Sequence, residues 1–213
     1  MFDSTPTLII ACGAIAHELT AVVRLNKLEH VTIECLPASW HNTPDRITPA
    51  VEKKISESKD MYPRILVAYG DCGTGGQLDK ILNQHNIQRL PGAHCYSFFA
   101  GHDVFADMAE EEAGTFYLTD YLVDNFDRLI LEDLGINKHP ELRSMYFGNY
   151  TRMIYLCQSE DTVKKTARIE KAEDAASALN LPLQIHVTGL QPFERAFEQA
   201  FKSIHIGAAS KHA

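Results

Sequence analysis

Short apolar runs alternate with longer amphipathic stretches along the whole chain. The runs are rich in β-branched and aromatic residues, which favours strands, whereas the stretches between them repeat their apolar positions every three to four residues, which favours helices. The strands expected from this pattern are 7–13, 30–37, 64–70, 87–92, 115–120, 151–158 and 182–189. The expected helices are 14–28, 49–58, 75–85, 102–114, 120–135, 139–149, 162–180 and 192–204.

This alternation predicts the fold class. Strands that alternate with helices form a mostly parallel sheet with helices on both faces, so we expect an α/β, doubly wound, Rossmann-like three-layer architecture. A length of 213 residues with 45% apolar composition suits one core. We expect a single domain over residues 1–206, with a possible subdivision near 123–150, and a disordered tail at 207–213.

Charge and hydropathy narrow the classes of partner. The formal net charge is −8 and the basic residues are dispersed, which argues against a nucleic-acid partner. No apolar run approaches the roughly 18 residues of a membrane span, and the start of the chain lacks the basic residues of a secretory signal. We therefore expect a cytoplasmic protein, without a membrane partner, that acts on a small molecule.

The five cysteines provide the candidate chemistry. They form no CxxC pair, so a zinc finger or zinc ribbon is not indicated, and a reducing compartment disfavours disulfides. Cys12, Cys72 and Cys95 each lie at or after the end of an expected strand. Because parallel sheets bind ligands beyond the carboxyl ends of their strands, we expect these three at one edge of the sheet. Cys35 and Cys157 lie inside strands, where we expect them in the core.

The segment YGDCGTGG, residues 69–76, is the most informative turn. Gly70, Gly73 and Gly75 permit a tight backbone, and exposed amides beside a helix start would favour a Cys72 thiolate. The alternative is an ordinary strand–helix turn with a small buried cysteine. We expect Gly73 and Thr74 to contact a substrate.

Two further loops carry polar and aromatic side chains. The segment WHNTPDR contains Trp40, His41, Asn42 and Arg46, which suit the binding of a polar ligand against an aromatic wall. His94 precedes Cys95 and could hold a neighbouring thiol as thiolate. Thr119 and Asp120 end another expected strand and could reach the same edge, although Asp120 could equally cap the next helix.

Three thiolates from separate loops permit two kinds of metal centre with one open position. A [4Fe–4S] cluster on three cysteines leaves one iron free for substrate, and Zn²⁺ on three cysteines leaves a place for water or a thiol. A metal-free alternative has Cys72 as a nucleophile with His41 or His94 as catalytic base. Binding without either chemistry is also open.

The chain resembles the bacterial and archaeal family catalogued as domain of unknown function 1638. The matching segments are IACGAIAHEL, HNTPDRI, YGDCG, HCYSFFAG and GTFYLTD, in this order over residues 8–122. The resemblance implies that Cys12, Cys72 and Cys95 are its shared cysteines, although archaeal members often have Asp where this chain has His94. It also implies a context of corrinoid proteins and methyltransferases in one-carbon metabolism.

Together these observations predict a metal- or Fe–S-binding protein that acts in corrinoid-linked methyl transfer or one-carbon metabolism. If it is an enzyme, it is a metal-dependent transferase, with a zinc–thiolate methyltransferase as one form. The alternative is a non-catalytic partner or activator that docks on a corrinoid protein or methyltransferase. For that reading, YSFFAG at 96–101 is the best candidate for an exposed apolar patch.

Overall fold

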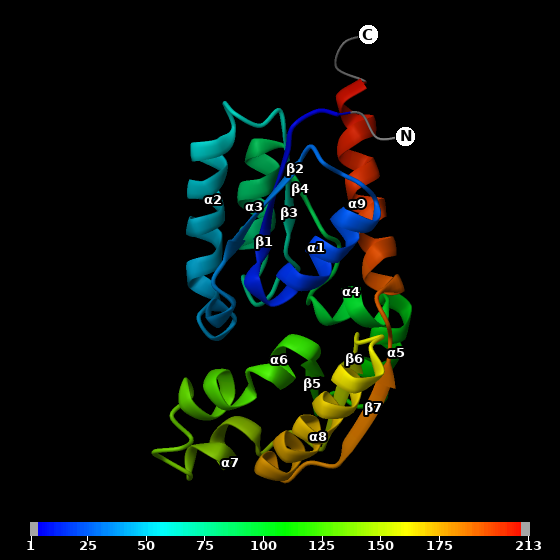
Figure 1. The fold of residues 1–213 in the computed structure, drawn as a ribbon. Helices are drawn as coiled ribbons and strands as arrows, with labels where there is room; N and C mark the ends of the chain where they lie inside the picture. The colour runs from blue at the N-terminus through cyan, green and yellow to red at the C-terminus, as the bar shows by residue number, and fades with distance from the viewer. Residues whose placement is uncertain (1–3, 210–213) are drawn as a thin grey trace. The chain divides into compact units, whose positions relative to one another are not determined.

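The computed structural model describes residues 4–209, with side chains through residue 204, as a parallel α/β protein (Figure 1). The strands are β1 (Thr7–Cys12), β2 (Val31–Leu36), β3 (Arg64–Ala68), β4 (Gln88–Arg89), β5 (Thr115–Thr119), β6 (Arg152–Cys157) and β7 (Leu183–Val187). The α-helices are α1 (Ala16–Leu25), α2 (Ile47–Ser58), α3 (Gln77–His85), α4 (Tyr96–Ala100), α5 (His102–Glu111), α6 (Asp120–Asp124), α7 (Leu142–Phe147), α8 (Thr162–Leu179) and α9 (Gln191–Ala209). Short 3₁₀ segments are η1 (Gly13–Ile15), η2 (Ala38–Asn42) and η3 (Pro44–Arg46), and η4 (Asp127–Glu132) is π-helical.

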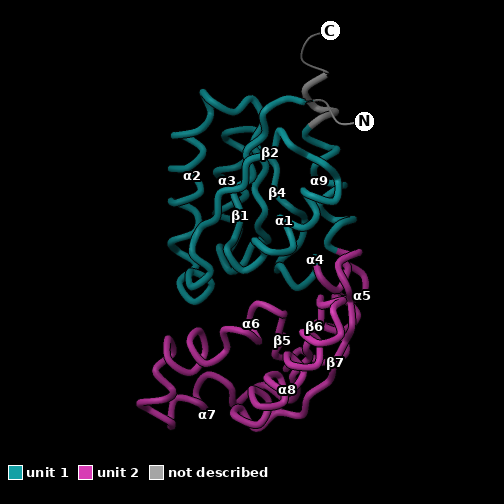
Figure 2. Tube along the Cα trace, viewed as in Figure 1, with its two compact units in different colours: residues 1–98, 193–213 teal, residues 99–192 magenta. Residues whose placement is uncertain are grey.

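The chain forms two compact units (Figure 2). Unit 1 contains the chain up to Phe98 and the segment from Phe193 onward, and unit 2 contains Phe99–Pro192. Unit 1 is therefore discontinuous, and α9 completes it after unit 2. This division does not test independent folding, so the single domain over residues 1–206 stays a prediction.

Unit 1 is built on a four-stranded parallel sheet in the order β2-β1-β3-β4. Figure 1 shows α2 and α3 on one face and α1 and α9 on the other. Successive residues of β1 point to opposite faces: Leu8 and Ile10 pack with α2 and α3, while Ile9 and Ala11 are equally buried on the other side. Burial on both faces explains why β1 and β3 are continuous apolar runs rather than alternating ones.

Unit 2 contains a second parallel sheet, in the order β5-β6-β7. Alternate residues of β6, Met153, Tyr155 and Cys157, share a core cluster with small residues of α8. Phe105 of α5 packs against Tyr117 of β5, with ring centroids 5.0 Å apart. This sheet has its own core, independent of the one formed by α2, α3 and their sheet.

The α/β class and the parallel strand direction expected from the sequence are confirmed, but the strands form two sheets and not one. Two helix assignments also differ. The expected helix over 120–135 is interrupted at Asn125, whose side-chain amide donates to the Tyr121 carbonyl at 2.9 Å and competes with the backbone. Helix α5 ends at Glu111, before the end expected at residue 114.

Other differences concern exposure and the chain end. The segment 96–101 is not an exposed apolar patch, because Ser97 to Ala100 are buried and form most of α4. Cys35 is exposed on the edge strand β2, contrary to expectation, while Cys157 is buried as expected. Helix α9 runs to Ala209, within the tail expected at 207–213, and residues 210–213 lie outside the described part. Over residues 4–209, no helix combines the length and apolar character that a membrane crossing requires.

Candidate functional site

Cys12, Cys72 and Cys95 line one small cavity of unit 1, although 60 and 23 residues separate them along the chain. Cys12 is the last residue of β1, Cys72 follows β3, and Cys95 directly precedes α4. The cavity has a volume of about 20 Å³. That is room for about one water-sized group. The other lining residues are Ala14, Ile15, Pro37, Trp40, His41, Ile47, Ala68, Tyr69 and Gly70.

The strand order explains why the cavity lies here. From the neighbouring strands β1 and β3, the chain proceeds to β2 on one side and to β4 on the other. The loops after two such strands diverge and leave a crevice at the carboxyl edge of the sheet, where open α/β folds bind ligands. Cys12 and Cys72 follow the two strands that border this crevice.

The loop carrying Cys72 is fastened to the loop carrying Cys95. The backbone amides of Asp71 and Cys72 donate to the carbonyls of Gly92 and Ala93, at 3.2 and 2.8 Å. A Cβ at Gly70 would lie 3.0 Å from the backbone of His94, so only glycine permits this approach without a shift. The two loops are thus packed backbone against backbone.

Asp71 holds the glycine-rich turn in shape. Its carboxylate accepts hydrogen bonds from the Thr74 hydroxyl at 2.7 Å and from the amides of Gly75 and Gly76 at 3.1 and 2.8 Å. Cys72 itself has φ of 49°, a left-handed conformation that is unfavourable for a residue with a Cβ. Strained non-glycine residues of this kind concentrate at functional sites.

The three thiols have different proton affinities. The hydrogen bond from Cys95 lowers the pKa of Cys72, against burial and with help from backbone amides. The bond that Cys95 donates, together with burial, raises the pKa of Cys95. Burial raises the pKa of Cys12 to about 11. Cys72 is therefore the sulfur most ready to lose its proton.

Two histidines, His41 and His94, lie close to the three thiols. The rings of His41 and His94 are 5.5 Å apart, and His94 stacks on Tyr96 with centroids 5.3 Å apart. His41 keeps a solvent-exposed edge, yet desolvation and the neighbouring His94 lower its pKa to about 4. Desolvation also lowers the pKa of His94. His41 is therefore neutral near pH 7.

Two buried polar atoms close to the thiols lack a hydrogen-bond partner of ordinary geometry: the Tyr69 hydroxyl and Nδ1 of His94. Tyr69 lines the cavity, is 2% exposed and lies beside the Cys12 sulfur. Buried polar groups are normally paired, so the Tyr69 hydroxyl is suited to a ligand in the cavity. Across residues 4–204, no group of three or more His, Cys, Asp or Glu side chains is placed so that it could hold a metal ion.

The structure brings together some of the expected site residues and separates others. Trp40 and His41 line the cavity with the three cysteines. His94 lies beside them, as its ring contact with His41 shows. The remaining expected substrate residues, Asn42, Arg46, Gly73 and Thr74, lie outside the cavity lining. The assignment of these residues to ligand or substrate binding stays a prediction.

Sequence analysis missed two contributors to the site. Tyr69 is the last apolar residue before the glycine-rich turn, and its place at the carboxyl end of the run could have identified it. Asp71 precedes Cys72, and an Asp followed by Thr and Gly three and four positions later is a common turn pattern.

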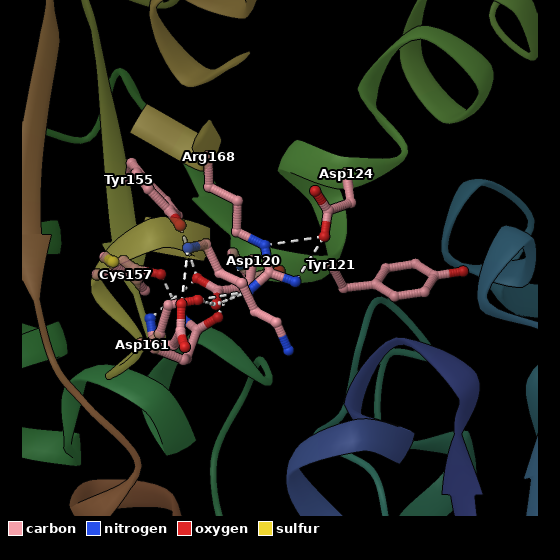
Figure 3. A network of polar contacts seen from close by, with 12 residues as sticks. Asp120, Tyr121, Asp124, Tyr155, Cys157, Asp161 and Arg168 are labelled. Atoms are coloured by element: carbon pink, nitrogen blue, oxygen red, sulfur yellow. Dashed lines mark hydrogen bonds and ion pairs between the residues drawn. The ribbon is translucent and has the colours of Figure 1, made fainter. Parts of the chain in front are cut away.

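Thr119 and Asp120 belong to unit 2, where Thr119 ends β5 and Asp120 begins α6. The Thr119 side chain caps α6 by accepting from the Leu122 amide. Asp120 is at the centre of a buried network (Figure 3). Its carboxylate accepts from the Tyr155 hydroxyl at 2.7 Å and the Gln158 amide at 3.0 Å.

The same carboxylate forms an ion pair with Arg168 and accepts a hydrogen bond from the Ser159 hydroxyl. Arg168 also forms an ion pair with Asp124 (Figure 3). Every oxygen of Asp120 is thereby engaged by protein groups. We interpret this network as a brace between α6, β6 and α8, not as a ligand site.

A protein-family model described as "Protein of unknown function (DUF1638)" matches residues 35–197. No curated protein and no solved structure matches the chain.

Proposed function

Because the chain belongs to the DUF1638 family, whose description assigns no function, we propose a function from the geometry of its own residues: a thiolate metal centre that binds a small molecule. Cys12, Cys72 and Cys95 would be the metal ligands. The observation that carries the proposal is that three cysteines, delivered by three separate loops, line one cavity at the reversal of strand order.

The donor set supports a soft metal ion. Thiolate sulfur selects Zn²⁺ or iron–sulfur centres over the harder divalent cations. Three protein ligands leave one position open, as in catalytic and not structural zinc sites. The buried Tyr69 hydroxyl, which lies beside the Cys12 sulfur, could contact whatever fills that position.

Cavity size favours a single ion over a cluster. A volume of about 20 Å³ suits one water-sized particle, whereas a [4Fe–4S] cluster contains eight atoms. A bound Zn²⁺ would supply the means to hold a thiol substrate as thiolate at neutral pH.

The chain's own residues prepare the site for this role. Cys72 is the thiol closest to deprotonation, and the other two would release their protons on metal binding, as thiol ligands must. Trp40 provides an apolar wall, and His41 provides a neutral imidazole beside the bound molecule. A methyl or other one-carbon unit as the transferred group, and a corrinoid protein or methyltransferase as partner, stay predictions from the family resemblance.

The proposal is tested by metal and sulfide analysis of protein purified anaerobically. We expect about one metal ion per chain without acid-labile sulfide. The Cys72→Ala variant should lose metal affinity by more than about tenfold, since even substitutions beside a ligand cost that much. Cys35→Ala is the matched control, because Cys35 is exposed and lies outside the cavity. Sulfide with absorption near 400 nm would replace the single ion by a cluster, and unchanged metal content in Cys72→Ala would refute the site.

One observation favours a second candidate. The pKa of Cys72 is lowered, and His41 is neutral in the same cavity, so Cys72 could act as a nucleophile with His41 as base. A metal-free protein in which iodoacetamide alkylates Cys72 much faster than Cys12 would favour this candidate.

A further inference from the structure

We propose that Cys72 and Cys95 are a redox pair: a peroxide converts them to a reversible disulfide, which removes two of the three sulfurs from the candidate metal site. Formation of the bond rests on the arrangement of the two cysteines alone. Its consequence for metal binding rests on the proposed function.

The first argument is the contact between the thiols. Cys95 donates its S–H to the sulfur of Cys72, so the two sulfur atoms already face each other. Cys12 lines the same cavity, but its hydrogen bonds are with the Ala14 backbone and the Tyr69 hydroxyl, and Cys72 affects it only through charge. The geometry therefore selects one pair from the three cysteines.

The second argument is that the backbone holds this pair in place. The bonds from Asp71 to Gly92 and from Cys72 to Ala93 connect the two loops directly beside the thiols. Gly70 packs on the backbone of His94, the neighbour of Cys95. Loops fixed in this way hold the two cysteines close together, and a disulfide requires such closeness.

The third argument concerns which oxidant can enter. Cys72 is 6% exposed, Cys95 is half-buried, and the cavity they share has room for about one small molecule. Hydrogen peroxide is little larger than water, whereas a disulfide such as oxidised glutathione is a hexapeptide-sized molecule. We expect peroxide, and not a bulky disulfide, to oxidise the pair rapidly.

The chemistry balances in two steps. The Cys72 sulfur attacks one peroxide oxygen, the O–O bond breaks, and Cys72 becomes a sulfenic acid with release of one water. The Cys95 sulfur then attacks the Cys72 sulfur, which releases a second water and forms the disulfide. Overall the two thiols lose two electrons and two protons, and one hydrogen peroxide becomes two waters. A dithiol reductant reverses the change by thiol–disulfide exchange.

The chain is convenient for testing this, because trypsin places each of its five cysteines in a different peptide. Cys72 lies in 65–80, Cys95 in 90–128 and Cys12 in 1–24, while Cys35 and Cys157 lie in 28–46 and 153–164. Full-length metal-free protein would be treated with hydrogen peroxide, its remaining thiols alkylated, and its peptides analysed without reduction.

We expect 65–80 joined to 90–128 as the dominant cross-linked product, lost after dithiothreitol. Cys95→Ser should stop at the sulfenic acid, which dimedone then traps on 65–80. Cys35→Ser is the control and should give the same cross-link as the unaltered protein. Separate, alkylated peptides 65–80 and 90–128, or a dominant cross-link to 1–24, would overturn the pairing.

A second arm separates this proposal from the metal centre. Zinc content is measured before oxidation, after it, and after reduction. If zinc is lost when the cross-link forms and is bound again after reduction, the redox pair and the metal centre are both supported. A reversible cross-link in protein that never binds metal would leave the redox pair standing and refute the metal centre, while metal binding without a cross-link would do the reverse.

Discussion

Cys72 is unusual at the level of its own backbone. The other described non-glycine residues with left-handed φ are Lys27, Asn86 and Asn180, and all three follow the end of a helix, where this conformation is tolerated as a cap. Cys72 has φ of 49° with no such tolerance. A residue that is costly for the backbone is best explained by the chemistry of its thiol, which agrees with the proposed ligand role.

The cost can be measured with a matched pair of variants. We expect Cys72→Gly to be more stable than Cys72→Ala by about 1 kcal/mol, because both lack the thiol and only alanine keeps the strained Cβ. Urea unfolding of the metal-free variants gives the difference. At the exposed helical position Lys53, the order of Ala and Gly should reverse. Equal stabilities at position 72 would show that the backbone there is not strained.

Residue patterns predicted that Cys12, Cys72 and Cys95 lie at one edge of the sheet, but not which loop residues line the cavity beside them. Cys12 and Cys72 follow strands of high apolar content, and parallel strands necessarily direct their carboxyl ends to one edge. Gly73, Thr74, Asn42 and Arg46 lie in loops, where side-chain direction depends on the turn conformation. Nothing in the local sequence fixes that conformation, so their place outside the cavity lining could not be foreseen.

At the level of elements, α6 and α8 are joined by an ion-pair network around Asp124. Arg168 and Lys171 of α8 contact its two carboxylate oxygens, at 2.6 and 2.9 Å. Burial alone would raise the pKa of Asp124, but these cations outweigh burial and lower it below the ordinary value of 3.8. The ionised carboxylate is therefore the form that stabilises the folded protein.

The sign of the pH dependence follows from that lowered pKa. Asp124 contributes stability at pH values above its unfolded pKa, and this contribution disappears as the pH falls through its folded pKa. Asp124→Asn should therefore lower stability at pH 7 and make little difference near pH 2. Urea midpoints from pH 7 to pH 2 measure this, with Asp127→Asn as control. A deficit in Asp124→Asn that stays constant down to pH 2 would contradict the ion-pair explanation.

The same scale shows why two sheets were predicted as one. Both sheets consist of parallel strands with crossover helices. The spacing of apolar residues along the chain is therefore the same for β1 to β4 as for β5 to β7. What separates them is pairing between strands: β4 has only the two residues Gln88 and Arg89 and ends the first sheet. Strand pairing is a long-range property, and a local pattern of apolar residues does not specify it.

At the scale of the whole molecule, each unit has its own sheet and its own core cluster, and the cavity with its three cysteines belongs to unit 1 alone. Asp120 is the buried centre of the polar network in unit 2. Without this carboxylate, Arg168 and the Tyr155 hydroxyl each lose a partner. Such a loss typically lowers the free energy of unfolding by about 3 kcal/mol.

The single tryptophan makes the two units distinguishable, because Trp40 packs against the core of unit 1. In Asp120→Ala we expect the far-ultraviolet circular dichroism transition to begin at lower urea, while the Trp40 fluorescence midpoint and the metal content stay unchanged. Coincident shifts of both signals would instead mean that the units unfold as one cooperative domain, as the sequence analysis predicted for residues 1–206. Separate transitions would explain how a stable brace in unit 2 can coexist with a strained, reactive cysteine in unit 1, since strain in one unit need not lower the stability of the other.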